Sequence, residues 1–341
     1  MIFKYLSIKY IKFFLIFLVG VCLLFVLVDY IYNVDSLPNS SNLQILYLFY
    51  KFVYASFIMY PLALVFSFLL ILNNLIKFNE LVSFYSLGFK PKKLLFPFLA
   101  VAFSIFVFFS FLQSTKISYA NQYAKAIQAN MNLKNSNLFL KYQNFIVYFK
   151  SLNPIVKHAY DIRIFELKND AIVKVIFAKR AVFRNDKWEC KRATVLTLKK
   201  DKWEKSVKDV TILKNFKPKI ISNLKMLNNI SFYDAYITLK YFKDVDLNKI
   251  LSIVFFKIFT PLSMILLIVL FFYLAPIHFR FSNLTLFMVK SLIFTILVWG
   301  IMLLIFKFSK QGILPFYIIV IPFVILLIMD LVIVRRKNDR L

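Results

Sequence analysis

The sequence predicts a helical membrane protein of six transmembrane helices, arranged three and three, with an all-β domain inserted between the two groups. Six long apolar stretches predict the helices, and a central segment of alternating apolar and charged residues predicts the inserted domain. The chain of 341 residues is 61% hydrophobic and 18% charged, against about 45–50% and about 25% in soluble proteins. This composition excludes a water-soluble enzyme and a disordered chain.

Each apolar stretch has the length of about 20 residues that a helix needs to cross a bilayer. The first is not a cleavable signal peptide, because its apolar core is too long and no small-x-small cleavage site follows it. We therefore expect six permanent spans. They cover residues 10–32, 46–76, 94–112, 250–276, 284–306 and 313–334.

The basic residues of the short loops fix the expected orientation, since Lys and Arg accumulate on the cytoplasmic side. With six spans counted, the basic clusters before residue 13, at 77–93, at 278–280 and at 335–340 all fall on one side. The short loop at 307–310 is the exception. Both termini are therefore expected in the cytoplasm and the long segment between spans three and four outside it.

That long segment, residues 114–248, is expected to be a domain rich in β-structure. Apolar and charged residues alternate with a period of two, and polar turn clusters separate the runs, a pattern typical of short antiparallel strands. The runs lie at 145–149, 162–167, 173–177 and 194–198. A jelly-roll-like sandwich or an open barrel fits this spacing. Helical stretches at 114–131 and 231–242 are expected to lead out of the membrane and back.

Three parts of the chain follow from this pattern. Residues 1–113 form the first three spans, residues 114–248 the inserted domain, and residues 249–341 the last three spans with a basic tail. The net charge of +28 lies in the loops and in the inserted domain rather than along one exposed helix. No nucleic-acid partner is therefore expected.

No catalytic or metal-binding motif accompanies this architecture. The two histidines, His158 and His278, fall on opposite sides of the membrane, and the cysteines Cys22 and Cys190 lie in a span and in the inserted domain. With only 4 glycines, a phosphate-binding glycine loop is not expected. The chain is therefore expected to be a non-enzyme without its own cofactor or metal.

Charged residues inside the spans are candidate functional residues, because burying them in a bilayer is costly. Lys51 and Lys257 lie toward the outer ends of spans two and four, at the depth of the phosphates of an outer-leaflet lipid. Asp29, near the outer end of span one, is their candidate counter-ion. These three residues are the predicted lipid-contact set, and the alternative for the lysines is snorkelling to the interface.

The loop between spans two and three predicts a short amphipathic helix within residues 77–90. Leu81, Phe84 and Tyr85 have helical spacing, and Gly88 followed by Pro91 marks the end of the helix. Such a helix can anchor the loop at the membrane interface, or it can be the element that a cytoplasmic ATPase moves. Its apolar residues can also be buried against the chain's own spans.

Several short motifs follow one another along nearly the whole chain, at residues 61–64, 79–81, 87–89, 144–148, 257–262, 312–315 and 335–337. In this order and spacing they resemble the LptF/LptG family of lipopolysaccharide export permeases. Asp29 within residues 25–30 is more similar to the LptG-type member than to the LptF-type, although Val26 or Leu27 stands where family members often carry a lipid-contacting Lys.

The resemblance implies one half of an ABC-type exporter in the bacterial inner membrane. An LptF-type permease, a dimeric LptB-type ATPase that binds ATP and Mg, and a periplasmic LptC-type protein would be its partners, and lipopolysaccharide its cargo. The loop helix would contact the ATPase and the β domain would form a periplasmic slide for acyl chains. The implied coupling residues are Glu80, Leu81, Phe84, Tyr85, Gly88, Phe89 and Lys90, and the implied slide interior is Ile146, Tyr148, Ile164 and Phe177.

Two other functions stay open at this stage. A mechanotransmission permease also combines spans with a large external domain, but it is expected to have four spans. A non-transporting scaffold whose β domain binds a periplasmic partner needs no cytoplasmic docking helix. The loop at 77–90 therefore favours the exporter.

Overall fold

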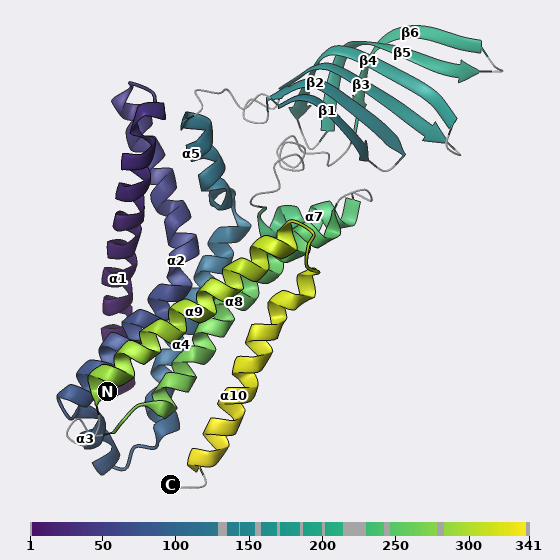
Figure 1. The fold of residues 1–341 in the computed structure, drawn as a ribbon. Coiled ribbons are helices and arrows are strands. Elements are labelled where there is room, and N and C mark those ends of the chain that lie inside the picture. Colours follow the sequence, from purple (N-terminus) through teal and green to yellow (C-terminus); the bar gives the residue numbers. More distant parts are fainter. Residues whose placement is uncertain are drawn as a thin grey trace. The chain divides into compact units, whose positions relative to one another are not determined.

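The computed structural model describes most of the chain and divides it into two compact units (Figure 1). One unit holds Met1–Asp35, Ile45–Asn121 and Asn248–Leu341, and the other holds Ser36–Gln44 and Gln122–Leu247. The described residues are 2–128, 135–142, 144–153, 158–168, 171–184, 187–199, 202–213, 230–241, 246–277 and 283–338.

Among the described residues of the first unit, six helices are long and apolar enough to cross a membrane, which confirms the predicted spans. The first group is α1 (Ile2–Asn33), α2 (Ser41–Lys77) and α4 (Pro91–Ser114). The second is α8 (Leu247–Leu274), α9 (Leu284–Lys310) and α10 (Ile321–Asn338), the last preceded by the 3-10 turn η3 (Phe316–Val320). The short elements along the chain are η1 (Val34–Ser36), α3 (Glu80–Ser86), η2 (Lys116–Tyr119), α5 (Ala120–Gln128) and α7 (Phe232–Tyr241), of which α7 belongs to the second unit.

The spans pack through narrow apolar stripes rather than through whole faces. α1 buries a stripe at helical spacing that includes Leu6, Tyr10, Phe14 and Leu18, whereas α2 is the most buried span. Aromatic contacts tie α2 to its neighbours, since the ring of Tyr60 stacks on Phe109 of α4 with centroids 4.2 Å apart. The remaining apolar faces stay exposed, as expected of helices that contact lipid.

The described residues of the inserted domain form an open antiparallel sheet of six strands in sequential order, β1 to β6. It confirms the predicted antiparallel β domain between the two groups of spans. The strands are β1 (Asn135–Tyr142), β2 (Phe145–Asn153), β3 (His158–Lys168), β4 (Ala171–Arg184), β5 (Lys187–Lys199) and β6 (Lys202–Ile212). The core of this unit includes Trp188, whose ring contacts Phe149 and Phe183, and Ile237 of α7.

The register of the sheet shows that the four predicted slide residues do not share one face. Val147 pairs with Ile164, which pairs with Ile176, and this row is buried. Tyr148 pairs with Arg163, which pairs with Phe177, and Ile146 points to the same side as Tyr148 because it lies two residues away. The predicted grouping of Ile164 with the other three was therefore wrong. Both faces of β2 carry apolar residues, so strand alternation alone could not separate them.

Candidate coupling helix and charged sites in the spans

The loop helix α3 ends in a glycine-dependent turn, as the sequence predicts. The N–H of Gly88 donates to the carbonyl of Tyr85 at 2.9 Å, and the N–H of Phe89 donates to the carbonyl of Phe84 at 3.1 Å. These two bonds, with Gly88 at φ +80°, define a Schellman motif. The rings of Phe84 and Phe89 close the motif with centroids 6.4 Å apart. The turn thus fixes where the chain leaves α3 and enters α4.

One side of α3 packs on the spans of its own chain. Leu81 is 3% exposed within the membrane-unit core, and Phe84, Tyr85 and Phe89 are partly buried against that core. Burial against the chain's own spans, the alternative left open above, is therefore what the structure shows for Leu81. The exposed apolar side chains of this loop are instead Phe78, 65% exposed, and Leu87, 71% exposed. Lys90 is also exposed.

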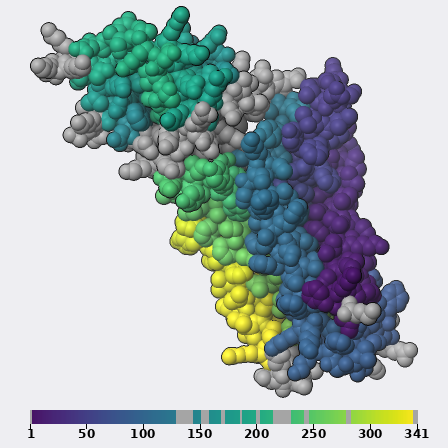
Figure 2. All heavy atoms as spheres, turned by 180° about the vertical axis from the view of Figure 1, so that it is seen from behind, coloured from purple at the N-terminus to yellow at the C-terminus, as the bar shows by residue number. Residues whose placement is uncertain are grey.

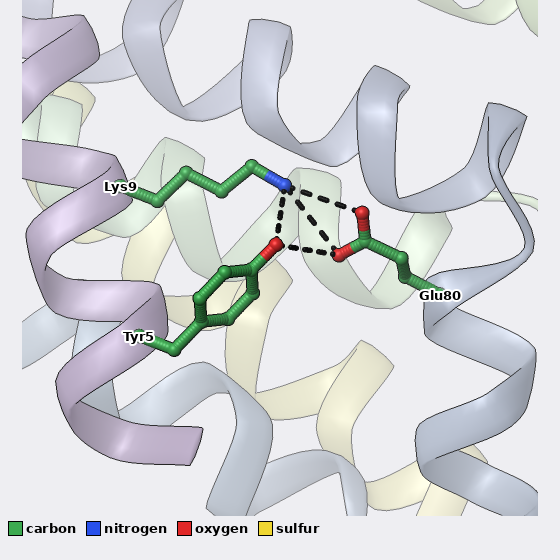
Figure 3. A network of polar contacts seen from close by, with 3 residues as sticks. All are labelled: Tyr5, Lys9 and Glu80. Atoms are coloured by element: carbon green, nitrogen blue, oxygen red, sulfur yellow. Dashed lines mark hydrogen bonds and ion pairs between the residues drawn. The ribbon is translucent and has the colours of Figure 1, made fainter. Parts of the chain in front are cut away.

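Glu80 pairs with a lysine of α1 (Figure 3). The Lys9 Nζ atom lies 3.4 Å from Glu80 Oε1, and the Tyr5 hydroxyl donates to Glu80 Oε2 at 3.2 Å. Lys9 also donates to the Tyr5 hydroxyl at 3.0 Å. The side chains of Lys9 and Glu80 are 19% and 30% exposed, so solvent only partly screens this pair. The first residue of α3 is therefore held to the beginning of α1 by three polar contacts, one from the Tyr5 hydroxyl and one from Lys9 Nζ to each carboxylate oxygen of Glu80.

A second ion pair lies near the opposite ends of α1 and α2. Lys51 Nζ lies 2.8 Å from Asp29 Oδ1, and the Tyr47 hydroxyl donates to Asp29 Oδ2 at 2.5 Å. The side chains of Lys51 and Asp29 are only 8% and 18% exposed. Asp29 is thus the counter-ion of Lys51, as the sequence suggested. Because Lys51 is neutralised inside the chain, it is less suited to hold a lipid phosphate than its position in the sequence indicates.

Lys257 has a different environment from Lys51. Its ammonium group donates to Ser118 Oγ of η2 at 3.1 Å, so it links α8 to the segment that follows α4. Asp29, which the sequence proposed as a shared counter-ion, has its described side-chain contacts with Lys51 and Tyr47. The structure therefore brings together two of the three predicted lipid-contact residues and places Lys257 in a separate contact.

Sequence reasoning missed one charged residue of the spans, Asp330 in α10. Its side chain is buried, 7% exposed, and within the described part of the chain neither carboxylate oxygen has a hydrogen-bond partner. Asp330 lies inside the apolar stretch at 313–334. The rule that singled out Lys51 and Lys257 would therefore have found it as well.

Cys190 is buried in the β domain, 1% exposed, and among the described residues no group of three His, Cys, Asp or Glu could hold a metal ion. Burial raises the pKa of the Cys190 thiol to about 12. Since the thiolate is the reactive form, we expect N-ethylmaleimide at pH 8 to label Cys190 at least about 100-fold more slowly in the folded protein than in detergent-unfolded chain. Peptide mass spectrometry over time measures this. Equal rates would contradict the buried position.

Within the described part of the chain, six helices that can span a membrane stand in two groups of three with a β domain inserted between them, which is the architecture of a multi-pass membrane protein. The family described as lipopolysaccharide export system permease LptF/LptG matches residues 4–336. The chain therefore belongs to this family and is a multi-pass inner-membrane protein. The match does not distinguish the two subunit types. No curated protein gives a significant match to the chain.

Proposed function

We propose that this chain is one of two permease halves of an ABC-type exporter that takes lipopolysaccharide from the outer leaflet of the inner membrane and passes it into the periplasm. An LptF-type permease would be the second half, with this chain as the LptG-type subunit. A dimeric LptB-type ATPase would bind ATP and Mg and supply the energy. Because the ATPase hydrolyses the ATP, this chain would need no catalytic residues of its own. An LptC-type protein would receive the lipid.

The observation that carries the proposal is the two-sided geometry of the α3 loop. Leu81 and Glu80 attach α3 to its own spans, while Phe78 and Leu87 stay exposed beyond the ends of the helices. In the proposed complex the ATPase would cover these two exposed apolar side chains. A helix that is attached on one side and exposes apolar residues on the other can transmit the movement of an ATPase to α1, α2 and α4.

The proposed orientation places α3 and both termini in the cytoplasm and the β domain in the periplasm. The basic residues of the short loops support it, because Lys and Arg are enriched on the cytoplasmic side. In this orientation Lys257 lies toward the periplasmic side of α8, and it is the remaining candidate for contact with a lipid phosphate. The β domain, an open antiparallel sheet, would form the periplasmic slide for acyl chains.

Capture of partners from detergent-solubilised membranes tests the coupling surface. We expect the tagged wild-type chain to retain an ATPase with a phosphate-binding glycine loop, a second permease of this family and lipopolysaccharide. Leu87→Asp should lower ATPase recovery about tenfold, as loss of a buried interface side chain typically does, and should leave the second permease bound. Quantitative mass spectrometry measures each protein.

Ile313→Asp is the matched control, because Ile313 is 65% exposed in the turn after α9, beyond the opposite ends of the spans. This variant should retain the ATPase. Recovery of neither ATPase nor second permease by the wild type would refute the exporter proposal. Unchanged ATPase recovery with Leu87→Asp would refute the assigned docking surface.

A further inference from the structure

An apolar groove with a cavity volume of about 500 Å³ lies between α1 and α4. Figure 2 shows the two helices beside each other on one face of the membrane unit, α1 in purple and α4 in blue. Side chains from both helices line the groove in roughly equal number. They are Phe3, Ser7, Ile11, Phe14, Leu15 and Leu18 of α1, and Ala100, Val101, Ser104, Ile105, Phe108 and Phe109 of α4.

The groove has a buried floor and an exposed rim. Phe14, Leu18 and Val101 are at most 7% exposed, whereas Leu15 and Phe108 are 52% and 58% exposed. The groove is therefore open along its side, where a span contacts the bilayer. An apolar surface of this kind in the membrane is filled either by lipid or by another helix.

The size of the groove favours a single acyl chain over a helix. From Phe3 to Leu18 it extends about 22 Å along α1, at 1.5 Å per residue. A helix about 10 Å wide would occupy about 1,700 Å³ over that length, more than three times the cavity volume of about 500 Å³. A flexible chain of methylene groups has the slender shape that the groove requires.

Polar and charged side chains lie at one end of the groove. Ser7 is 8% exposed, and its Oγ atom has no hydrogen-bond partner among the described residues. Lys4 lies one turn before Ser7 on the same face of α1, and Lys93 lies two turns before Ala100 on the same face of α4. Both lysines are exposed. The rings of Phe3 and Phe96 are 5.9 Å apart, so the beginnings of the two helices lie side by side.

We propose that this groove binds one acyl chain of an anionic glycerophospholipid from the leaflet at the α3 end of the spans. Lys4 and Lys93 hold the phosphate, the Ser7 hydroxyl donates to the ester carbonyl, and the chain lies along the floor between Phe14 and Val101. The order of charge, hydroxyl and apolar floor along the groove matches the order of phosphate, ester and acyl chain in the lipid. The site requires only that the chain spans a bilayer and not that it exports lipopolysaccharide.

Photolabelling of the full-length chain tests this site directly. The chain is placed in phosphatidylcholine nanodiscs with a small fraction of phosphatidylglycerol that carries a diazirine on one acyl chain. We expect peptides with residues 11–18 and 100–109 to be labelled several-fold more than the lipid-facing residues of α10, such as Ile328 and Leu331, which are 54% and 61% exposed. Unlabelled phosphatidylglycerol should compete for this label, and additional phosphatidylcholine should not.

Two charge-matched double variants separate the site from general attraction of anionic lipid. Lys4→Gln with Lys93→Gln should reduce groove labelling about tenfold, the expected effect of two lysines at a membrane surface. Lys12→Gln with Lys92→Gln removes the same charge from exposed positions off the groove faces and should leave the labelling within about twofold. Equal loss in both pairs, or uniform labelling of all spans, would overturn the proposal. Competition by phosphatidylcholine would also overturn the proposal. Labelling that appears only after a protein bound over the groove is removed would overturn it as well.

Discussion

Asp29→Ala should lower the free energy of unfolding by about 3 kcal/mol, because it leaves the Lys51 ammonium buried without its counter-ion. Lys51 is 7% exposed, its side chain lies 2.8 Å from Asp29, and Tyr47 donates to the same carboxylate. Thermal unfolding in detergent should show a clear loss of stability. The ends of α1 and α2 that carry this pair should open first, since the pair and Tyr47 join them.

The double variant Asp29→Ala with Lys51→Met is the control for this prediction. A methionine of similar length fills the same space without a charge, so most of the lost stability should return. If Lys51 instead binds a lipid phosphate, Asp29→Ala should hardly change the free energy of unfolding, and Lys51→Met should lower lipopolysaccharide binding. The two results therefore distinguish a structural pair from a lipid contact.

The spans and the end of α3 could be predicted from the sequence because each depends on local information. Length and hydropathy determine which segments can cross a bilayer, and Gly88 at φ +80° accounts for the turn that ends α3. The pairing of Asp29 with Lys51 could be predicted because two opposite charges at the same depth in adjacent spans neutralise each other and so lower the cost of burying either one. These features required no knowledge of how distant elements pack.

Other features depend on contacts between residues far apart in the chain. Glu80 was predicted as an ATPase-coupling residue, and its pairing with Lys9 could not be predicted, because Lys9 lies 71 positions away in sequence and no local pattern brings the two together. Leu81 was predicted as a coupling residue with burial against its own spans as the alternative, and the structure buries it in the chain's own core. Which face of the sheet carries the Ile164 side chain could be determined only from the strand register, which pairs Ile164 with Val147.

Reversing the charge at Glu80 should have the second large effect, on the contact between α3 and α1 and on ATPase activity. In Glu80→Lys the new ammonium faces Lys9 where the native Nζ–Oε1 distance is 3.4 Å, so attraction becomes repulsion. At the effective dielectric constant of a partly exposed site this changes the free energy by about 2–4 kcal/mol. We expect α3 to separate from α1 and lipopolysaccharide-stimulated ATPase activity of the reconstituted complex to fall at least about tenfold.

Exchanging the charges of Glu80 and Lys9 shows whether the loss of ATPase activity comes from the broken pair with Lys9 or from a lost contact with the ATPase. With Lys9→Glu added to Glu80→Lys, the pair within the chain is restored in reverse, and ATPase activity should recover to within about threefold of the wild type. If Glu80 instead serves an arginine of the ATPase, the swap should stay inactive, because the lysine of α3 would still face a cation. Tyr5→Phe, which removes only the hydroxyl bond to Glu80, should cost about 1 kcal/mol and retain coupling. Recovery with the swap would mean that α3 transmits force to α1 through this pair, so that the ATPase contact has to be sought elsewhere on the loop, as the Leu87→Asp variant does.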